Sequence, residues 1–351
     1  MISARLLTLA RCPECLGSLA GDARGDAVAC AACGRRYSTM GGACLDLRPA
    51  RQFEEQTKYL DEALHADARH ERVSPALLGS KIRNDMLRRM LAPGADDLVV
   101  DLGCGSGRAL VWNRDLGATA IGIDISPFFS EEARHQVDLL LGDLRRLPFA
   151  DATFTKAWSL DVLEHLSPDA LLDVLREASR VLAPGGELFV YTHVRKNAWP
   201  ARGLRAINRL GQRLERAGLI DARQERLRKS DHLNPLRDIP HLEEVCRASG
   251  FRIRSICYYS PIIGGFVENI LVRLVERSMA KRAARRLGNS ADPGDLEARA
   301  VREARAAAKA RIARSRTTYA ALRGLSALMK LDLLLFGRVR SGPFFAVLIK
   351  D

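Results

Sequence analysis

The sequence of 351 residues lacks an apolar run long enough to cross a membrane, and only 6% of its residues are aromatic. A membrane-spanning helix needs about 18 or more apolar residues in succession. The nearest candidate segments are interrupted by Glu268 and Arg273 in one case and by Lys330 and Asp332 in the other. No secretory signal is recognisable near the first residues. We therefore expect a cytoplasmic protein without a transmembrane segment.

A cysteine framework of the kind found in small secreted domains is also missing. Four of the eight cysteines stand in two close pairs, and the others are single residues: Cys44, Cys104, Cys246 and Cys257. In a reducing compartment this distribution indicates a metal site together with unpaired thiols.

Acidic residues are in deficit: 42 of them face 55 lysines and arginines, which gives a formal net charge of +13. Such a balance favours an anionic partner, which could be nucleic acid, acidic lipid or a phosphorylated small molecule. The excess consists mainly of arginine, and alanine is abundant as well, so a compositional bias of the source explains it equally well. Apart from its charge, the sequence has an ordinary composition: 47% of its residues are hydrophobic, which is sufficient for a globular core.

The paired cysteines Cys12, Cys15, Cys30 and Cys33 form a C-x2-C motif that recurs after fourteen residues. Four thiolates in two tight turns can surround one Zn²⁺ ion as a closed tetrahedral site, which is structural because no coordination position stays open. Gly34 follows the second pair, where the turn needs a residue that tolerates positive φ. Residues 1–48 contain too little core to fold without such a staple.

From residue 98 onward, short apolar runs alternate with helical patterns. The runs occupy residues 98–102, 118–125, 137–141, 157–160 and 186–192, and strand-like runs return at 251–259 and 343–350. Strands that alternate with helices predict a parallel sheet with both faces covered. Residues 49–97 have helical patterns at 53–64 and 80–91, and they predict a helical connection.

A glycine-rich loop follows the first of these strands. Asp101 is followed by Gly103, Gly105 and Gly107, and a helical pattern comes next. Glycines at such a turn let a ligand approach the backbone at the carboxyl ends of parallel strands. A dinucleotide fold is the alternative, but Arg108 takes the place of the last glycine in its G-x-G-x-x-G fingerprint.

Carboxylates recur at the ends of the next two strands. Asp124 ends the second strand about twenty residues past the glycines, where an acid can accept both hydroxyls of a ribose. Asp143 follows the third strand. Three further segments accompany these acids, namely LPFADATF at 147–154, WSLDVLEHL at 158–166 and LAPGG at 182–186.

Taken in this order, the motifs resemble the class I S-adenosylmethionine (SAM)-dependent methyltransferases with a methyltransferase type 11-like domain. The resemblance covers residues 98–192 and resumes in the last two strands. It implies an α/β fold with a Rossmann-like seven-stranded sheet, and it implies that Asp143 reaches the adenine amino group. The implied cofactor-binding residues are Asp101, Gly103, Gly105, Gly107, Asp124, Ile125, Asp143, Leu144 and Ser159.

Within this resemblance, residues 1–48 are similar to the Trm112-like zinc-ribbon module that is fused to, or partnered with, several methyltransferases. Some of those enzymes act on ribosomal or transfer RNA. Residues 40–47 resemble the last strand of that module. The predicted organisation is therefore a zinc ribbon at 1–48, a helical connection at 49–97 and a class I methyltransferase domain at 98–351.

The sequence identifies no certain general base. A sulfonium leaving group needs no proton, so the main task of the site is to align the acceptor with the methyl carbon. A base is required only if the acceptor must lose a proton. The catalytic candidates are His193, just past the fifth strand, and Asp161, which either lines the site or caps a helix. His165 fits a packing role better, and His232 lies in an inserted loop.

Two arginine-rich helical insertions, at about 195–240 and 262–340, follow the fifth and sixth strands on the ligand side of the sheet. We expect them to cover the acceptor. Their amphipathic patterns favour a small-molecule or lipid-like acceptor and peripheral contact with an acidic membrane. Methylation of bases in ribosomal or transfer RNA is the alternative, and a solvated cap without a partner is the plainest interpretation. A non-catalytic SAM-binding adaptor is disfavoured because the loop and its acids are intact.

Overall fold

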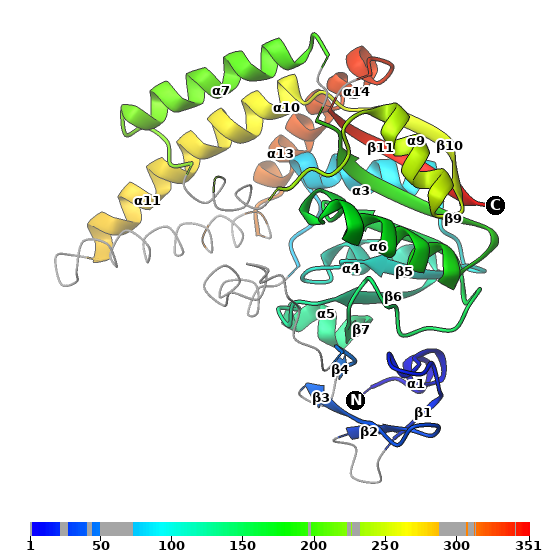
Figure 1. Ribbon diagram of the computed structural model, residues 1–351. Helices are drawn as coiled ribbons and strands as arrows, with labels where there is room; N and C mark the ends of the chain where they lie inside the picture. The colour runs from blue at the N-terminus through cyan, green and yellow to red at the C-terminus, as the bar shows by residue number, and fades with distance from the viewer. Residues whose placement is uncertain are drawn as a thin grey trace.

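The computed structural model describes residues 2–21, 27–40, 44–49, 73–195, 198–222, 226, 232–287, 307, 312, 314–340 and 342–351. Their strands form one continuous sheet in the order β1-β2-β3-β4-β7-β6-β5-β8-β9-β11-β10 (Figure 1). The strands are β1 (Leu19–Gly21), β2 (Ala27–Cys30), β3 (Arg36–Met40), β4 (Cys44–Asp46), β5 (Leu98–Leu102), β6 (Thr119–Asp124), β7 (Asp138–Leu141), β8 (Phe154–Leu160), β9 (Leu182–His193), β10 (Phe251–Tyr258) and β11 (Pro343–Lys350).

The centre of this sheet has the expected α/β architecture. Strands β7, β6, β5, β8 and β9 are parallel to one another. Strand β11 is antiparallel and lies between β9 and β10. The bounds of β5 and β11 coincide with the expected ranges 98–102 and 343–350. The carboxyl ends of the parallel strands therefore meet at a single edge, where ligands of open α/β sheets bind.

The expected number of seven strands is too small. Strand β4 pairs in parallel with β7, with Leu45 opposite Leu140 and Asp46 opposite Leu141. Strands β1 to β4 then continue the sheet in antiparallel fashion, so the described residues contribute eleven strands to it. The cysteine-containing segment thus extends the sheet of the larger domain, as Figure 1 shows at the β7 edge.

Both faces of the central strands are buried because their side chains alternate between two cores. In β5, Val100 and Leu102 belong to one buried cluster, and Val99 belongs to the other. The first face is covered by α6 (Pro168–Val181), and the second by α3 (Leu78–Met90). A strand buried on both sides appears as a continuous apolar run, and this explains why these strands are recognisable in the sequence.

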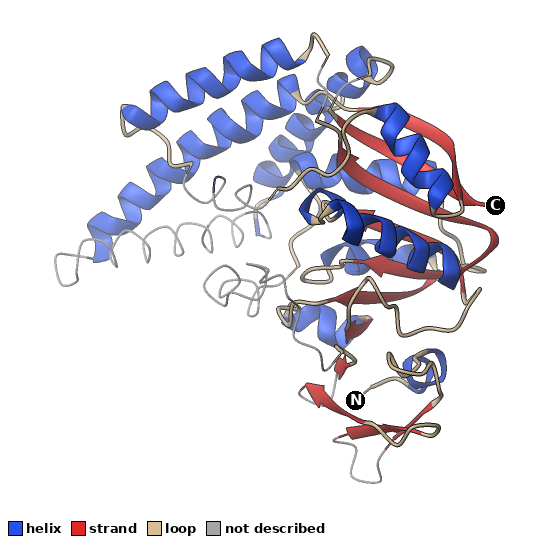
Figure 2. Cartoon of the chain, viewed as in Figure 1, coloured by secondary structure: helices blue, strands red, loops and turns tan. Residues whose placement is uncertain are grey.

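The remaining helical elements connect these strands or form the insertions (Figure 2). They are α1 (Ala4–Leu9), α4 (Arg108–Asn113), η2 (Arg114–Leu116), α5 (Glu131–Gln136), η3 (Leu163–His165), α7 (Ala201–Arg216), α9 (Ile239–Ala248), α10 (Ile262–Phe266), η4 (Val267–Val272), α11 (Arg273–Leu287), α13 (Arg316–Met329) and α14 (Leu331–Phe336). The short helix α1 was not expected from the sequence; the hydroxyl of Ser3 caps it by accepting a hydrogen bond from the Leu6 N–H.

Helices follow β9 and β10, within the ranges where the insertions are expected. Helix α7 packs against α10 and η4, and α13 packs against α3 on the second face of the sheet. The resulting cap lies over the β9–β10 end of the molecule, while the cysteine segment lies at the opposite end (Figure 1). In the described part of the chain, no helix combines the length and the apolar character that a membrane crossing requires.

The helical pattern expected at 53–64 lies outside the described ranges, and so do parts of the insertions expected at about 195–240 and 262–340. Within the connection at 49–97, α3 confirms the helix expected at 80–91.

Candidate functional site

The glycine loop between β5 and α4 has the backbone geometry that its sequence predicts. Gly103, Gly105 and Gly107 have φ of +80°, +55° and +80°. A Cβ atom at Gly103 would lie 2.5 Å from Val162 Cγ2, and one at Gly107 would lie 2.7 Å from Ala133 Cβ. A Cβ atom at Gly105 would have nothing within 4 Å. The outer two glycines therefore allow tight packing, whereas the middle one borders open space.

Asp124, at the end of β6, holds the loop in place. Its Oδ2 accepts a hydrogen bond from the Gly105 N–H at 2.7 Å, and its Oδ1 accepts one from the Ser126 N–H at 2.8 Å. Burial raises the pKa of Asp124, against the opposing effect of these N–H groups. A carboxylate has about four acceptor positions, so Asp124 can still accept hydrogen bonds from a ligand.

Asp101 lies beside this loop and is 1% exposed. Its Oδ2 has no hydrogen-bond partner among the described residues. Burial raises the pKa of Asp101 to about 7; Asp124 adds to the shift, and Trp158 opposes it. A buried carboxyl group without a partner is costly, and a cationic ligand would offset that cost.

The other predicted cofactor residues lie along the same edge. The Gly142 N–H donates to the Asp124 carbonyl at 2.9 Å, and this bond aligns the end of β7 with the end of β6. Asp143 follows there and pairs with Arg145, whose Nε lies 3.1 Å from Asp143 Oδ2. Ser159 is buried, and its hydroxyl donates to the Leu102 carbonyl at 3.0 Å, so it links β8 to β5. Ile125 and Leu144 directly follow Asp124 and Asp143 in the chain.

Asp161 does not cap a helix, contrary to one expectation. The cap of α6 is Ser167, whose hydroxyl accepts a hydrogen bond from the Ala170 N–H. Asp161 has a φ of +57°, and its Oδ2 lies 3.2 Å from Nε of Arg83. The Arg83 guanidinium is also 5.5 Å from the centroid of the Tyr191 ring.

Arg83 and Tyr191 were not identified from the sequence. Arg83 belongs to α3, which was expected only as a connection, and no motif distinguishes it. Burial lowers the pKa of Arg83, but Asp161, Tyr191, Glu268 and Tyr259 together outweigh this effect, and the pKa is raised. Arg83 therefore places a permanently charged guanidinium beside Asp161 at the end of β8.

Three histidines meet near the ends of β8 and β9. The rings of His165 and His232 are 4.5 Å apart, and those of His193 and His232 are 5.5 Å apart, measured between centroids. Glu164 lies beside them, is 3% exposed and accepts a hydrogen bond from the Thr192 hydroxyl at 2.9 Å. Burial, with a further contribution from Asp161, raises the pKa of Glu164 to about 8. The sequence analysis considered His193, His165 and His232 one at a time. It predicted neither that their rings lie close together nor that Glu164 lies beside them.

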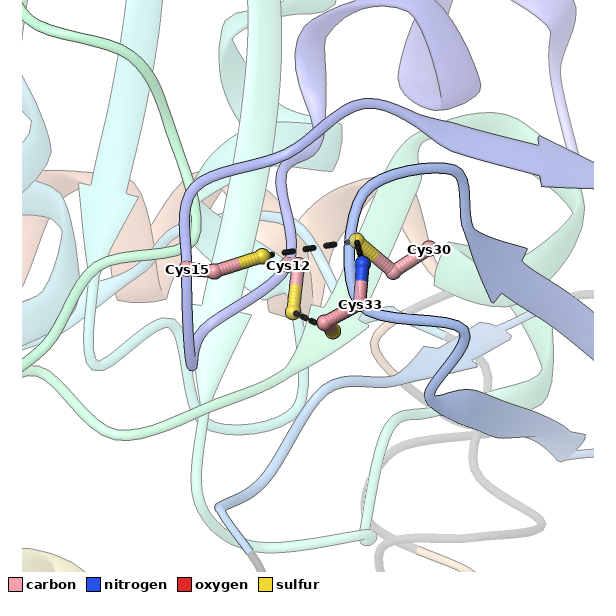
Figure 3. Close-up of side chains that lie close together, drawn as sticks. All are labelled: Cys12, Cys15, Cys30 and Cys33. Carbon is pink, nitrogen blue, oxygen red and sulfur yellow. Dashed lines mark hydrogen bonds between the residues drawn. The ribbon is translucent and has the colours of Figure 1, made fainter.

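The four paired cysteines converge as predicted, and their sulfurs all lie within 4.8 Å of one another (Figure 3). Sγ of Cys12 is 3.7 Å from that of Cys33, and Sγ of Cys15 is 3.5 Å from that of Cys30. Thiolates bound tetrahedrally to one Zn²⁺ at about 2.3 Å would be about 3.8 Å apart, so the sulfurs fit such an ion.

Two glycines shape the turns around these sulfurs. Gly34 has a φ of +71°, which confirms the expected left-handed turn. Gly17 was not singled out from the sequence, but a Cβ atom there would lie 2.9 Å from Sγ of Cys30. The cysteine turns therefore pack too closely to admit a side chain at this position.

The central part of the chain is similar to known proteins. Residues 100–190 match the family model described as a methyltransferase domain. The chain is similar to Methyltransferase GfsG of Streptomyces halstedii, with 33% identity over 128 residues that cover 34% of this chain and 45% of that protein. It is also similar to Sterol 4-C-methyltransferase strm-1 of Caenorhabditis elegans, with 31% identity and coverage of 28% and 31%.

A third similarity is to the mouse (Mus musculus) protein named Probable tRNA methyltransferase 9B, with 36% identity over 101 residues that cover 28% of this chain and 22% of that protein. The chain thus spans less than half the length of each of these relatives. The matched residues contain the glycine loop and the strand-end acids. Residues 100–190 are therefore similar to a methyltransferase domain, and they lie in the parallel part of the sheet.

The glycine geometry predicts different effects for two substitutions. Gly103→Ala combines positive φ with a clash against Val162, so we expect it to lower the free energy of unfolding by about 2 kcal/mol or more. Gly105→Ala adds only the backbone strain of about 1–2 kcal/mol, because its Cβ meets open space. Urea denaturation of both variants measures this difference. Equal losses, or a larger loss for Gly105→Ala, would contradict the assigned packing.

Proposed function

We propose that the protein transfers a methyl group from SAM to a small-molecule or lipid-like acceptor. The observation that carries the proposal is the buried, unpartnered carboxyl oxygen of Asp101 beside a glycine loop that Asp124 holds at the ligand edge of the sheet. SAM is cationic, and it supplies an electrophilic methyl group on sulfur when bound. The relatives are named as methyltransferases, in keeping with this activity.

The residues at this edge fit the cofactor. In the proposed complex, Gly103, Gly105 and Gly107 leave the backbone accessible, and Asp101 balances the positive charge of the ligand. Asp124 accepts the ribose hydroxyls, and Asp143 accepts the adenine amino group. The side chains of Ile125 and Leu144 contact the adenosyl group, while Ser159 fixes β8 against β5 through its bond to Leu102.

The acceptor would lie between the ends of β8 and β9 and the cap. We assign acceptor contacts there to Asp161, which the Arg83 guanidinium orients, and to His193 as the proton acceptor. Asp161 directly follows β8, which neighbours β5, and His193 is the last residue of β9. The residues around the acceptor would align it with the methyl carbon and exclude water. They need not supply a proton to the leaving sulfur, because a sulfonium leaves without protonation.

A lipid-like acceptor is supported by an apolar patch on the cap, formed by Trp199, Leu331, Leu334 and Leu335. Their exposed fractions reach 82% at Leu334, 63% at Leu335 and 62% at Trp199. The Trp199 ring lies 5.6 Å from that of Phe336 in α14, so the tryptophan belongs to the same surface. Exposed leucines beside tryptophan and nearby arginines are typical of helices that rest on an anionic membrane.

Methylation of an RNA base remains the alternative, favoured by the net charge of +13 and by the relative named as a tRNA methyltransferase. Binding through many phosphates weakens steeply as salt rises, whereas a neutral lipid-like acceptor is nearly insensitive to salt. A non-catalytic adaptor is less well supported, because such a protein has no need for Asp101, Asp124 and Asp143 at the edge of the sheet.

Methyl transfer to fractionated cell extract tests the proposed activity. With radiolabelled SAM, we expect label in the organic-soluble product and little loss of transfer between low and moderate salt. The Asp124→Ala variant should lose most of the transfer, whereas a variant of the exposed Asp169 on α6 should retain it. Label recovered mainly in RNA, with a steep salt dependence, would establish the alternative instead.

The raised pKa of Asp101 predicts how cofactor affinity depends on pH. Ionised Asp101 attracts the cationic ligand, so the association constant of SAM should rise with pH until about pH 7, by up to about tenfold per pH unit below that value. Calorimetric titrations at several pH values measure this slope. Asp101→Asn should bind more weakly and lose the slope; the same slope in that variant would exclude Asp101 as its source.

We also propose that Cys12, Cys15, Cys30 and Cys33 hold one structural Zn²⁺ ion, with residues 1–48 as a zinc module. Protein dialysed against a mild chelator should keep about one zinc ion per chain. Cys30→Ser should lose the ion and lower the free energy of unfolding by more than about 2 kcal/mol. Cys257→Ser, a control outside the cluster, should retain the zinc. Metal-free protein of unchanged stability would refute this assignment.

A further inference from the structure

A second set of metal-ligating side chains lies outside the cysteine cluster. We propose that Glu164, His165 and His232 bind a divalent transition-metal ion that holds an oxygen of the methyl acceptor. One ligand atom from each of the three residues lies within 4.8 Å of the others. This proposal rests on the proposed function, because it assigns the ion to the acceptor side of the same site.

The three residues come from two segments that the backbone fixes to each other. Glu164 and His165 belong to η3, whereas His232 belongs to the inserted loop that precedes α9. The Asn234 N–H donates to the Glu164 carbonyl at 2.9 Å. Asn234 is two residues after His232, so this main-chain bond holds the loop against η3. The bond does not involve the imidazole ring of His165 or of His232.

The same loop is also bound to Arg195, which lies two residues after the end of β9. The Arg195 N–H donates to the Leu236 carbonyl at 3.0 Å, and Nη2 of Arg195 donates to the Leu233 carbonyl at 3.1 Å. The segment that directly follows His232 is therefore bound to η3 through Asn234 and to Arg195 through two main-chain carbonyls. A metal ligand whose neighbours are held by hydrogen bonds loses less conformational freedom when it binds an ion.

The donor set is suitable for a transition metal. Two imidazoles and one carboxylate on one side of an ion form the facial arrangement that binds Fe²⁺, Zn²⁺ and related ions and leaves other positions open. The Thr192 hydroxyl donates to Glu164 Oε2 at 2.9 Å, and such outer contacts orient a ligating carboxylate. A carboxyl group that is only 3% exposed next to two imidazoles also gains a charge partner from a bound cation.

The location of the site suggests what the ion would do. It lies at the ends of β8 and β9, with the His193 ring 5.5 Å from that of His232. A hydroxyl oxygen bound to a divalent ion is more acidic than the free hydroxyl. The acceptor hydroxyl would give its proton to His193, and its oxygen would then bond to the methyl carbon as the carbon–sulfur bond breaks and sulfur keeps the electron pair. The acceptor is thus a hydroxylated, metal-binding compound.

Cobalt titration of the full-length protein, with zinc already in the cysteine site, tests the proposal. We expect one Co²⁺ per chain, with ligand-field bands but without the thiolate-to-cobalt charge-transfer band that a cysteine site gives. His232→Ala should weaken this binding by at least about 100-fold, because it removes one of three ligands. His135→Ala, a change at an exposed histidine on α5, should leave it unchanged.

Binding of S-adenosylhomocysteine and the unfolding transition are measured on the same variants. A folded His232→Ala protein that binds this nucleoside but not cobalt supports the site. Wild-type protein that binds the nucleoside but no second metal ion, or cobalt binding that survives His232→Ala, overturns the metal site and leaves the proposed function intact. Folded wild-type protein that binds no nucleoside refutes the proposed function itself.

Discussion

The hydrogen bond between the Gly105 N–H and the Asp124 carboxylate is the contact on which the candidate site depends. It joins the loop after β5 to the end of β6, and charge-assisted bonds of this kind are among the stronger ones in proteins. Asp101, two residues before Gly103, is buried, and one of its carboxyl oxygens has no hydrogen-bond partner among the described residues. Because the pKa of Asp101 is raised to about 7, its protonated form is favoured in the folded state. Its contribution to stability is therefore greatest below about pH 4 and is lost as the pH rises to about 7.

The segment with the paired cysteines is built into the main sheet, because its last strand, β4, pairs with β7. Leu45 in β4 is fully buried, and the Leu47 N–H donates to the Leu141 carbonyl at 2.8 Å beyond the paired residues. This pairing covers β7, which would otherwise be an exposed edge strand next to the site of Asp143. The proposed metal site is thereby linked through β4 to the central parallel strands, whereas the helices of the cap lie at the opposite end of the sheet.

The features that the sequence predicts are those with a local cause. The bounds of β5 and β11 follow from apolar runs that end at glycine or polar residues, and the left-handed glycines follow from their spacing. Strand β9 begins at Leu182 rather than at residue 186, because Leu182 pairs with Phe154 of another strand. Contacts between distant segments could not be predicted. The pairing of β4 with β7, the approach of Arg83 to Asp161 and the meeting of His232 with His165 all depend on how the chain returns to the sheet.

Calorimetric binding of SAM to folded wild-type protein, compared with Asp124→Asn and the exposed control Asp169→Asn, is the most direct measurement of the central claim. The account predicts that the wild type binds SAM and that Asp169→Asn binds it with the same affinity. In Asp124→Asn the affinity for SAM should fall by about tenfold to 100-fold, because the hydrogen bonds to a charged acceptor are weakened. Circular dichroism of each variant verifies that it is folded. A folded wild-type protein without affinity for SAM, or an Asp124→Asn variant that binds it equally well, would contradict the account.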